Sequence, residues 1–307
     1  MEFSILIEKM VIFSVLMLIG YVLARKGLVE RSFGRAASML VLDVFLPATI
    51  LNSVFVAETE LSAGELGKLM LLLTLTLGVG FVLAAVIARL TPLGRDPDRG
   101  AVFELLMGLS NTMFIGMPVA QELYGPTAVF YCALSCIPFN VYAYTYGVWR
   151  LKGGQGGALR VKDIFSLPLA ATLLAVPIFL LRVPIPGVVR QLAVALNGAT
   201  MPMSLLVIGF SMGTVSLIDA FRNKSLYLAS LLRIVVFPIL AWLAVGLFTD
   251  DYVLRMTCML LAASPGAVMV TVLTIQYGRD SVYGAKGVLQ STVLSILSIP
   301  LLILLLG

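Results

Sequence analysis

Apolar runs about 20 residues long recur along nearly the whole chain, and they limit its fold more than any other feature. A run of that length crosses a hydrocarbon core of about 30 Å as a helix. Only 12% of the residues are charged, about half the share found in soluble domains. The strands of a membrane barrel would instead show short segments of alternating hydrophobicity. The chain is therefore predicted to be an all-helical integral membrane protein in a lipid bilayer.

The runs predict about ten transmembrane helices. Their approximate ranges are 5–24, 36–56, 66–90, 101–123, 127–149, 164–182, 189–217, 225–248, 252–276 and 284–306. The first run carries Glu2 and Glu8 where a signal peptide would be basic, and its apolar part is long enough to span. We expect this helix to remain in the protein.

Basic residues gather in alternate loops. They follow the first, third, fifth, seventh and ninth spans, at Arg25, Lys26, Arg31, Arg35, Arg89, Arg95, Arg99, Arg150, Lys152, Arg160, Lys162, Arg222, Lys224, Arg279 and Lys286. Because basic loops face the cytoplasm, both termini are expected outside a cell inner (plasma) membrane. The net charge of +5 then reflects orientation in the membrane and not binding of nucleic acid.

The two halves of the chain share short motifs in the same order. "FLPATIL" at 45–51 is similar to "TMPMSLL" at 200–206, "ELYG" to "IQYG", and "CIPFN" to "SIPLL". Each half holds five spans, an odd number, so the second half enters the membrane from the opposite side. This predicts a 5+5 inverted repeat, with a first repeat at 1–150, a cytoplasmic linker at 151–163 and a second repeat at 164–307.

The fourth span contains "SNTMFIGMP" at 110–118, where three hydrogen-bonding side chains precede Gly116 and Pro118. Proline has no N–H and crowds the carbonyl four residues earlier, here that of Phe114, so the helix is predicted to break at this point. A break at membrane depth needs protein or a water-filled cavity to meet its polar groups.

The ninth span carries "AASPGAV" at 262–268 and is predicted to break at Pro265. Broken helices in equivalent places of inverted repeats are expected to cross, and their free N-terminal ends suit an anion. The predicted substrate-binding residues are Ser110, Asn111, Thr112, Gly116, Pro118, Ser264, Pro265 and Gly266.

"NTMFIGMP" followed by "LYG", with "ASPGAV", "YG" and "STVLSILSIP" in the second half, resembles the auxin efflux carrier family. That family includes the plant PIN-formed carriers and bacterial carriers of malonate and related acids. Ser110 stands where plant members usually have proline, which is closer to the bacterial branch. The resemblance implies a ten-helix inverted-repeat fold related to the bile acid sodium symporters.

The resemblance also implies a scaffold made of helices 1, 2, 6 and 7 and a mobile transport unit made of helices 3–5 and 8–10. We expect an elevator-type movement between them, and a homodimer formed through the scaffold. In the fifth helix the resemblance implies that Asn140 and Tyr144 line the site. The alternative is that Tyr142, Tyr144 and Tyr146 form an interfacial aromatic belt.

The expected function is a secondary transporter, an efflux carrier for small organic anions such as auxin-like, monocarboxylic or dicarboxylic acids. The chain has no histidine, the commonest metal ligand and general base, and no nucleotide-binding motif. No enzymatic activity, metal or cofactor is expected. The alternatives are a ligand sensor or channel on the same fold, or a sodium-coupled organic anion symporter.

Asp43 in the second span is the candidate group for energy coupling. Placing an ionisable group inside a membrane costs about 2.5–3.5 kcal/mol, so such a group is a functional candidate by default. The alternative is that Asp43 lies at the interface or pairs with a basic residue, for which Arg233 in the eighth span is a candidate. The ninth span offers no acidic residue for a sodium site of the kind found in bile acid symporters. Transport is therefore expected to be uncoupled or proton-linked, with no sodium requirement.

Overall fold

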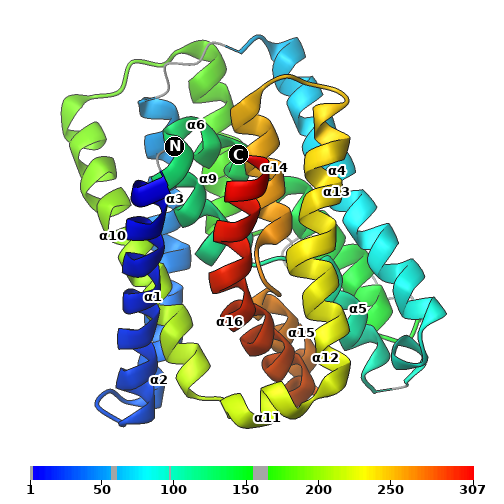
Figure 1. Cartoon of the computed structure of the whole chain (residues 1–307). Coiled ribbons are helices and arrows are strands. Elements are labelled where there is room, and N and C mark those ends of the chain that lie inside the picture. The colour runs from blue at the N-terminus through cyan, green and yellow to red at the C-terminus, as the bar shows by residue number, and fades with distance from the viewer. Residues whose placement is uncertain (1–2, 57–60, 97, 155–164) are drawn as a thin grey trace. The chain divides into compact units, whose positions relative to one another are not determined.

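The computed structural model describes residues 3–56, 61–96, 98–154 and 165–307, and within them the chain is helical with no β-strand (Figure 1). In chain order the helices are α1 (Phe3–Arg25), α2 (Arg31–Leu40), α3 (Leu46–Phe55), α4 (Ala63–Leu90), α5 (Gly100–Gly108), α6 (Met117–Tyr142), α7 (Val148–Leu151), α9 (Leu167–Leu181), α10 (Gly187–Gly213), α11 (Leu217–Arg222), α12 (Lys224–Leu231), α13 (Phe237–Gly246), α14 (Tyr252–Ala263), α15 (Val268–Gln276) and α16 (Ser281–Leu306). Short π-helical turns join some of them: η1 (Val41–Phe45), η3 (Thr112–Gly116), η4 (Ala143–Gly147) and η5 (Leu232–Val236).

The all-helical membrane character predicted from the sequence is confirmed. Six helical segments are long and apolar enough to cross a membrane: Ser32–Phe55, Ala63–Leu90, Thr112–Leu151, Gly187–Gly213, Lys224–Gly246 and Ser281–Leu306. Helices also occupy the other predicted ranges, and the apolar α9 and α14 are shorter. The count of ten spans and the inverted repeat stay predictions, and most of the predicted linker at 151–163 lies outside the described residues.

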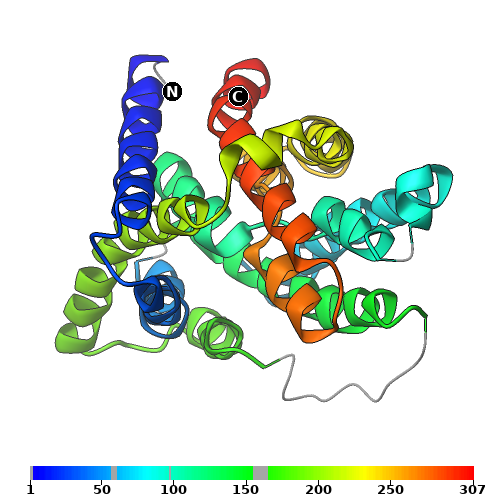
Figure 2. The ribbon, with the colours of Figure 1, turned by 90° about the horizontal axis from the view of Figure 1, so that it is seen from below.

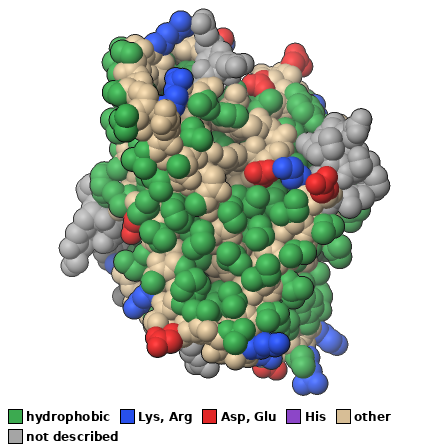
Figure 3. Space-filling view, turned by 90° about the vertical axis from the view of Figure 1, so that its left-hand side faces the viewer, with side chains coloured by type: hydrophobic (Ala, Val, Ile, Leu, Met, Phe, Trp, Pro, Cys, Tyr) green, Lys and Arg blue, Asp and Glu red, His purple; other side chains and the backbone are tan. Residues whose placement is uncertain are grey.

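Apolar side chains cover much of the face drawn in Figure 3, and charged ones gather mainly toward its edges. On α1, for example, Val11, Val15 and Leu18 are exposed. Large exposed apolar residues of this kind are costly in water and are expected in contact with lipid.

The chain divides into two compact units. Unit 1 consists of residues 1–72, 113–137 and 165–214, and unit 2 consists of residues 73–112, 138–164 and 215–307. Each unit therefore contains segments from both halves of the sequence. The helix labelled α6 changes direction at Gly125, whose φ of 73° is in the left-handed region that favours glycine.

In unit 1, α1 lies against α10 at backbone contact distance (Figure 1 and Figure 2). A Cβ atom on Gly209 would collide with the carbonyl group of Met17, and one on Gly20 with the carbonyl group of Leu206. Small residues allow membrane helices this approach, which maximises van der Waals contact where lipid offers no hydrophobic driving force.

Three of the π-helical turns end two residues before a proline: η1 before Pro47, η3 before Pro118 and η5 before Pro238. A π turn contains one residue more than an α-helical turn, and this shifts the carbonyls before the proline away from its ring. The helix therefore continues through the proline. The predicted break at Pro118 is therefore wrong. The fourth span is interrupted earlier, between the end of α5 at Gly108 and the start of η3 at Thr112.

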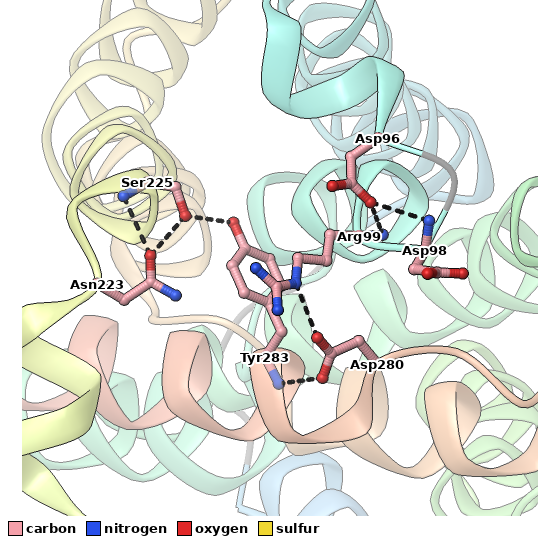
Figure 4. Close-up of polar contacts among 7 residues, drawn as sticks. All are labelled: Asp96, Asp98, Arg99, Asn223, Ser225, Asp280 and Tyr283. Atoms are coloured by element: carbon pink, nitrogen blue, oxygen red, sulfur yellow. Dashed lines mark hydrogen bonds and ion pairs between the residues drawn. The ribbon is translucent and has the colours of Figure 1, made fainter.

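A polar cluster joins the beginnings of α5, α12 and α16 in unit 2 (Figure 4). Arg99 Nε donates to Asp280 Oδ2 at 2.8 Å, and its guanidinium lies over the Tyr283 ring. The Tyr283 hydroxyl in turn hydrogen-bonds the Ser225 hydroxyl at 3.0 Å. Burial raises the pKa of Asp280, but the Tyr283 N–H and the Arg99 guanidinium outweigh it and leave that pKa below its ordinary value.

This cluster brings together loops that follow the third, seventh and ninth predicted spans. Asn223 Oδ1 accepts from the Ser225 N–H and so caps α12, and Arg279 Nε donates to the Leu151 carbonyl at 2.7 Å, which adds the loop after the fifth span. Four of the five basic loops expected to share one side of the membrane thus lie together in unit 2.

Substitution of Gly209 by Ala is expected to lower the melting temperature of the purified protein, because overpacking costs about 1–3 kcal/mol. The matched control is Gly198→Ala on the same helix, where an added Cβ meets nothing within 4 Å. That change should leave the melting temperature equal or higher, since alanine is the better helix former. Thermal unfolding in detergent measures both, and equal melting temperatures would contradict the close packing of α1 on α10.

Candidate functional site: two interrupted helices in unit 2

The interruptions after α5 and α14 pair with each other through their backbones in unit 2. The Asn111 N–H donates to the Pro265 carbonyl at 2.7 Å, and the Ala267 N–H donates to the Leu109 carbonyl at 2.9 Å. These bonds form an isolated antiparallel bridge, the only β-type pairing within the described residues. Each broken helix thus supplies partners for backbone groups that the other break has freed, as membrane depth requires.

Three consecutive polar side chains at this pairing have no hydrogen-bond partner within the described part of the chain. They are Ser110 Oγ, Asn111 Nδ2 and Thr112 Oγ1, and the three residues are only 1%, 4% and 1% exposed. An unsatisfied buried polar group costs about 1–3 kcal/mol, so such groups call for an explanation. Their clustering at a helix interruption makes this the candidate site, as the sequence predicted.

The predicted residues of the ninth span complete this arrangement. The Gly266 N–H donates to Ser291 Oγ of α16 at 3.1 Å. A Cβ on Gly266 would lie 3.3 Å from the end of the Leu106 side chain on α5, so any larger residue at position 266 would have to displace that side chain. Helix α15 and the helix formed by η3 and α6 both begin at the interruptions. The N-terminal end of a helix carries a partial positive charge.

Arg233 of η5 is buried, at 3% exposure, beside the opposite ends of the broken helices. Its Nη1 donates to the Met107 carbonyl at 3.0 Å, near the end of α5. Its Nη2 and Nε donate to the carbonyls of Leu261 and Ser264, at 3.1 Å and 3.0 Å, at the end of α14. These carbonyls belong to the negative ends of the two helix dipoles, so one guanidinium binds both half-helices.

Glu104 is a buried acidic residue that the sequence analysis did not identify as functional. It lies on α5, and its carboxylate accepts hydrogen bonds from Arg150 Nε at 2.6 Å and from the Tyr146 hydroxyl. The available signal was an ionisable residue inside an apolar span. The same signal applies to Arg233, which the sequence analysis named only as a candidate partner of Asp43, and the carbonyl partners of Arg233 have no sequence signature.

The other predicted site residues are more dispersed. Asn140 on α6 and Tyr144 on η4 belong to unit 2, where Tyr144 packs against the hydrophobic core. Gly116 and Pro118 lie in the segment 113–137, which belongs to unit 1. Asp43 lies on η1 in unit 1 with an exposed side chain.

Comparison with known proteins identifies the family of this chain. The model of the membrane transport protein family matches residues 5–159 and 155–303, which together cover nearly the whole chain. The chain belongs to the membrane transport protein family. The resemblance to auxin efflux carriers is thereby confirmed.

Two relatives of this membrane transport protein match nearly its whole length. It is 26% identical over 299 residues to an uncharacterized transporter of Methanothermobacter thermautotrophicus, with 94% of each chain covered. It is 23% identical over 301 residues to an uncharacterized transporter of Methanocaldococcus jannaschii, with 96% of each covered. The multi-pass membrane character predicted from the sequence agrees with this family.

Replacement of Thr112 by Val or of Asn111 by Ala tests whether these residues bind a ligand or only stabilise the fold. Both changes remove buried polar groups without partners, so the melting temperature of the empty protein should hold or rise. Transport into proteoliposomes should fall roughly 10- to 100-fold, the value of one or two hydrogen bonds to a charged ligand.

Thr257→Val on α14 is the matched control, because Thr257 is also a buried threonine of unit 2 whose hydroxyl has no partner. That variant should keep wild-type transport. If both Thr112→Val and Asn111→Ala transport substrate at the wild-type rate, the interruption is not the binding site.

Proposed function

We propose that this membrane transport protein is a secondary carrier of small organic anions that binds its substrate at the paired helix interruptions. Ser110, Asn111 and Thr112 would donate to the anion from the fourth span. Ser264, Pro265 and Gly266 would shape the site from the ninth. The row of three buried polar groups without partners carries this proposal.

An anionic substrate is favoured by the charges around the site. Two helices begin at the interruptions, and their N-terminal ends carry partial positive charge. Arg233 adds a full positive charge, and all three of its hydrogen bonds go to backbone carbonyls. Asn111 Nδ2 and the two hydroxyls can donate to carboxylate oxygens.

The proposed architecture is a 5+5 inverted repeat of ten transmembrane helices. Helices in all ten predicted ranges and an interruption in each half support it. The four basic loops that lie together in unit 2 support the proposed sidedness, with both termini outside and the linker in the cytoplasm. Cysteine labelling from each side at Gly154 and Gly307 tests this, and equal accessibility of the two positions would contradict it.

We further propose an elevator-type movement in which unit 2 carries the site. Unit 1 contains the four predicted scaffold spans, and unit 2 contains the eighth to tenth spans together with most of the third. The division supports the proposal, although it groups residues 113–137 with unit 1 where the whole fourth and fifth spans were predicted to move. The predicted homodimer through the scaffold belongs to the same proposal, and light scattering in detergent measures its mass.

Electron paramagnetic resonance distances between one spin label in each unit test the movement. We expect two distance populations whose ratio shifts when substrate is added, because a ligand that binds one state more tightly changes the populations. A control pair placed on α1 and α10 inside unit 1 should give one unchanged distance. One population between the units under all conditions would contradict the elevator.

A channel and a ligand sensor are the alternative functions on the same fold. A channel needs a continuous polar path, whereas the polar groups without partners in unit 2 concentrate at the interruptions. Counterflow, in which unlabelled substrate inside drives uptake of labelled substrate, distinguishes a carrier from both.

Transport should be measured in proteoliposomes with labelled monocarboxylates, dicarboxylates and aromatic acids, in sodium-free buffer with imposed pH gradients. We expect saturable counterflow without sodium, either uncoupled or proton-linked. If Asp43 is the coupling group, Asp43→Asn should abolish the response to pH while counterflow persists. A strict sodium requirement would overturn the coupling proposal, an unchanged pH response would exclude Asp43, and absence of counterflow for every acid would overturn the carrier.

A further inference from the structure

Arg233 occupies a position in unit 2 that usually suits a metal cation. Its guanidinium contacts three carbonyl oxygens from two helices far apart in the sequence, those of Met107, Leu261 and Ser264. All three belong to the final turn of a half-helix or to the unwound residue after it. In transporters with broken helices, carbonyls of these two kinds coordinate the coupling sodium ion or proton.

The charge of Arg233 has no carboxylate partner within the described residues. Glu104 lies on α5 three residues before Met107, but its carboxylate is held by Arg150 and Tyr146. The ion pairs of the described residues leave Arg233 out. It is therefore balanced only by helix dipoles and carbonyl groups, which leaves a net positive charge beside the interruptions.

The geometry suits a guanidinium better than a small ion. Five N–H donors in a rigid planar fork can reach carbonyls on different helices at the same time. A sodium ion in this position would dissociate and rebind during transport, whereas Arg233 is fixed to η5. The two half-helices are thus joined by a cation that cannot leave.

We infer that Arg233 is a covalently attached substitute for a coupling cation, so that the paired interruptions hold together and accept an anion without any inorganic cation. Removal of its charge opens a cavity lined by three carbonyl oxygens, which becomes a binding site for a monovalent cation or for guanidinium. The effect on transport rests on the proposed function, but the cation site does not.

The test is thermal unfolding of the purified full-length protein in detergent, with wild type, Arg233→Ala, Arg233→Gln and Arg233→Lys. Each is measured with sodium, potassium or methylguanidinium chloride at tens of millimolar, and N-methylglucamine chloride keeps the ionic strength constant. The control is Arg255→Gln, which removes another guanidinium of unit 2. Arg255 Nε donates to the Trp242 carbonyl at 3.0 Å, and the guanidinium stacks on the Trp242 ring.

The neutral Arg233 variants should melt roughly 5 °C or more below wild type, because three buried carbonyls lose their donors. At least one of the three added cations should recover a substantial part of that loss. Wild type, Arg233→Lys and Arg255→Gln should show no such recovery, since the first two keep a charge at the site and the third lies elsewhere.

The inference is overturned if no cation raises the melting temperature of Arg233→Gln or Arg233→Ala more than that of Arg255→Gln. If Arg233→Ala does not fold, the comparison between Arg233→Gln and Arg233→Lys decides the question in the same way. Sodium-stimulated counterflow by Arg233→Gln, beside sodium-independent counterflow by wild type, would extend the result to transport. Lack of counterflow in wild type itself would overturn the proposed carrier and leave the thermal result standing.

Discussion

Backbone polar groups have no water to bond with inside a membrane, and the pairing of two helix interruptions in unit 2 satisfies that constraint. Asn111 and Ala267 donate to carbonyls of the opposite chain segment. Arg233 provides donors for three more carbonyls at the helix ends. The interruption of the fourth span still leaves three consecutive buried side-chain atoms without partners within the described residues, at Ser110, Asn111 and Thr112, and this run defines the candidate site.

The sequence was sufficient for the all-helical membrane character and for the interruption at Pro265, because neither depends on distant contacts. It failed at Pro118, where a π-helical turn lets the helix continue and moves the interruption to residues 109–111. It named Arg233 only as a candidate partner of the Asp43 carboxylate. Carbonyl groups are present on every residue, so no residue type could reveal that those of Met107 and Leu261 bind this guanidinium.

Two buried charged residues of unit 2, Glu104 and Arg233, differ in whether their charge is balanced by an oppositely charged partner. The carboxylate of Glu104 is bonded to Arg150, so that pair contributes little net charge and ties α5 to α7. Arg233 also ties two elements together, yet its partners are neutral dipoles. It therefore leaves a positive potential at the interruptions. Burial and membrane depth alone would not have distinguished these two residues.

The buried side-chain groups without hydrogen-bond partners also suggest how substrate binding drives the proposed elevator movement. Three buried polar side chains without partners destabilise the empty site by about 1–3 kcal/mol each. A bound anion that satisfies them removes this cost only in conformations where the interruptions stay paired. A ligand shifts a conformational equilibrium by no more than its difference in affinity for the two states. The groups at Ser110, Asn111 and Thr112 can supply such a difference, so a substrate that satisfies more of them should shift the equilibrium further.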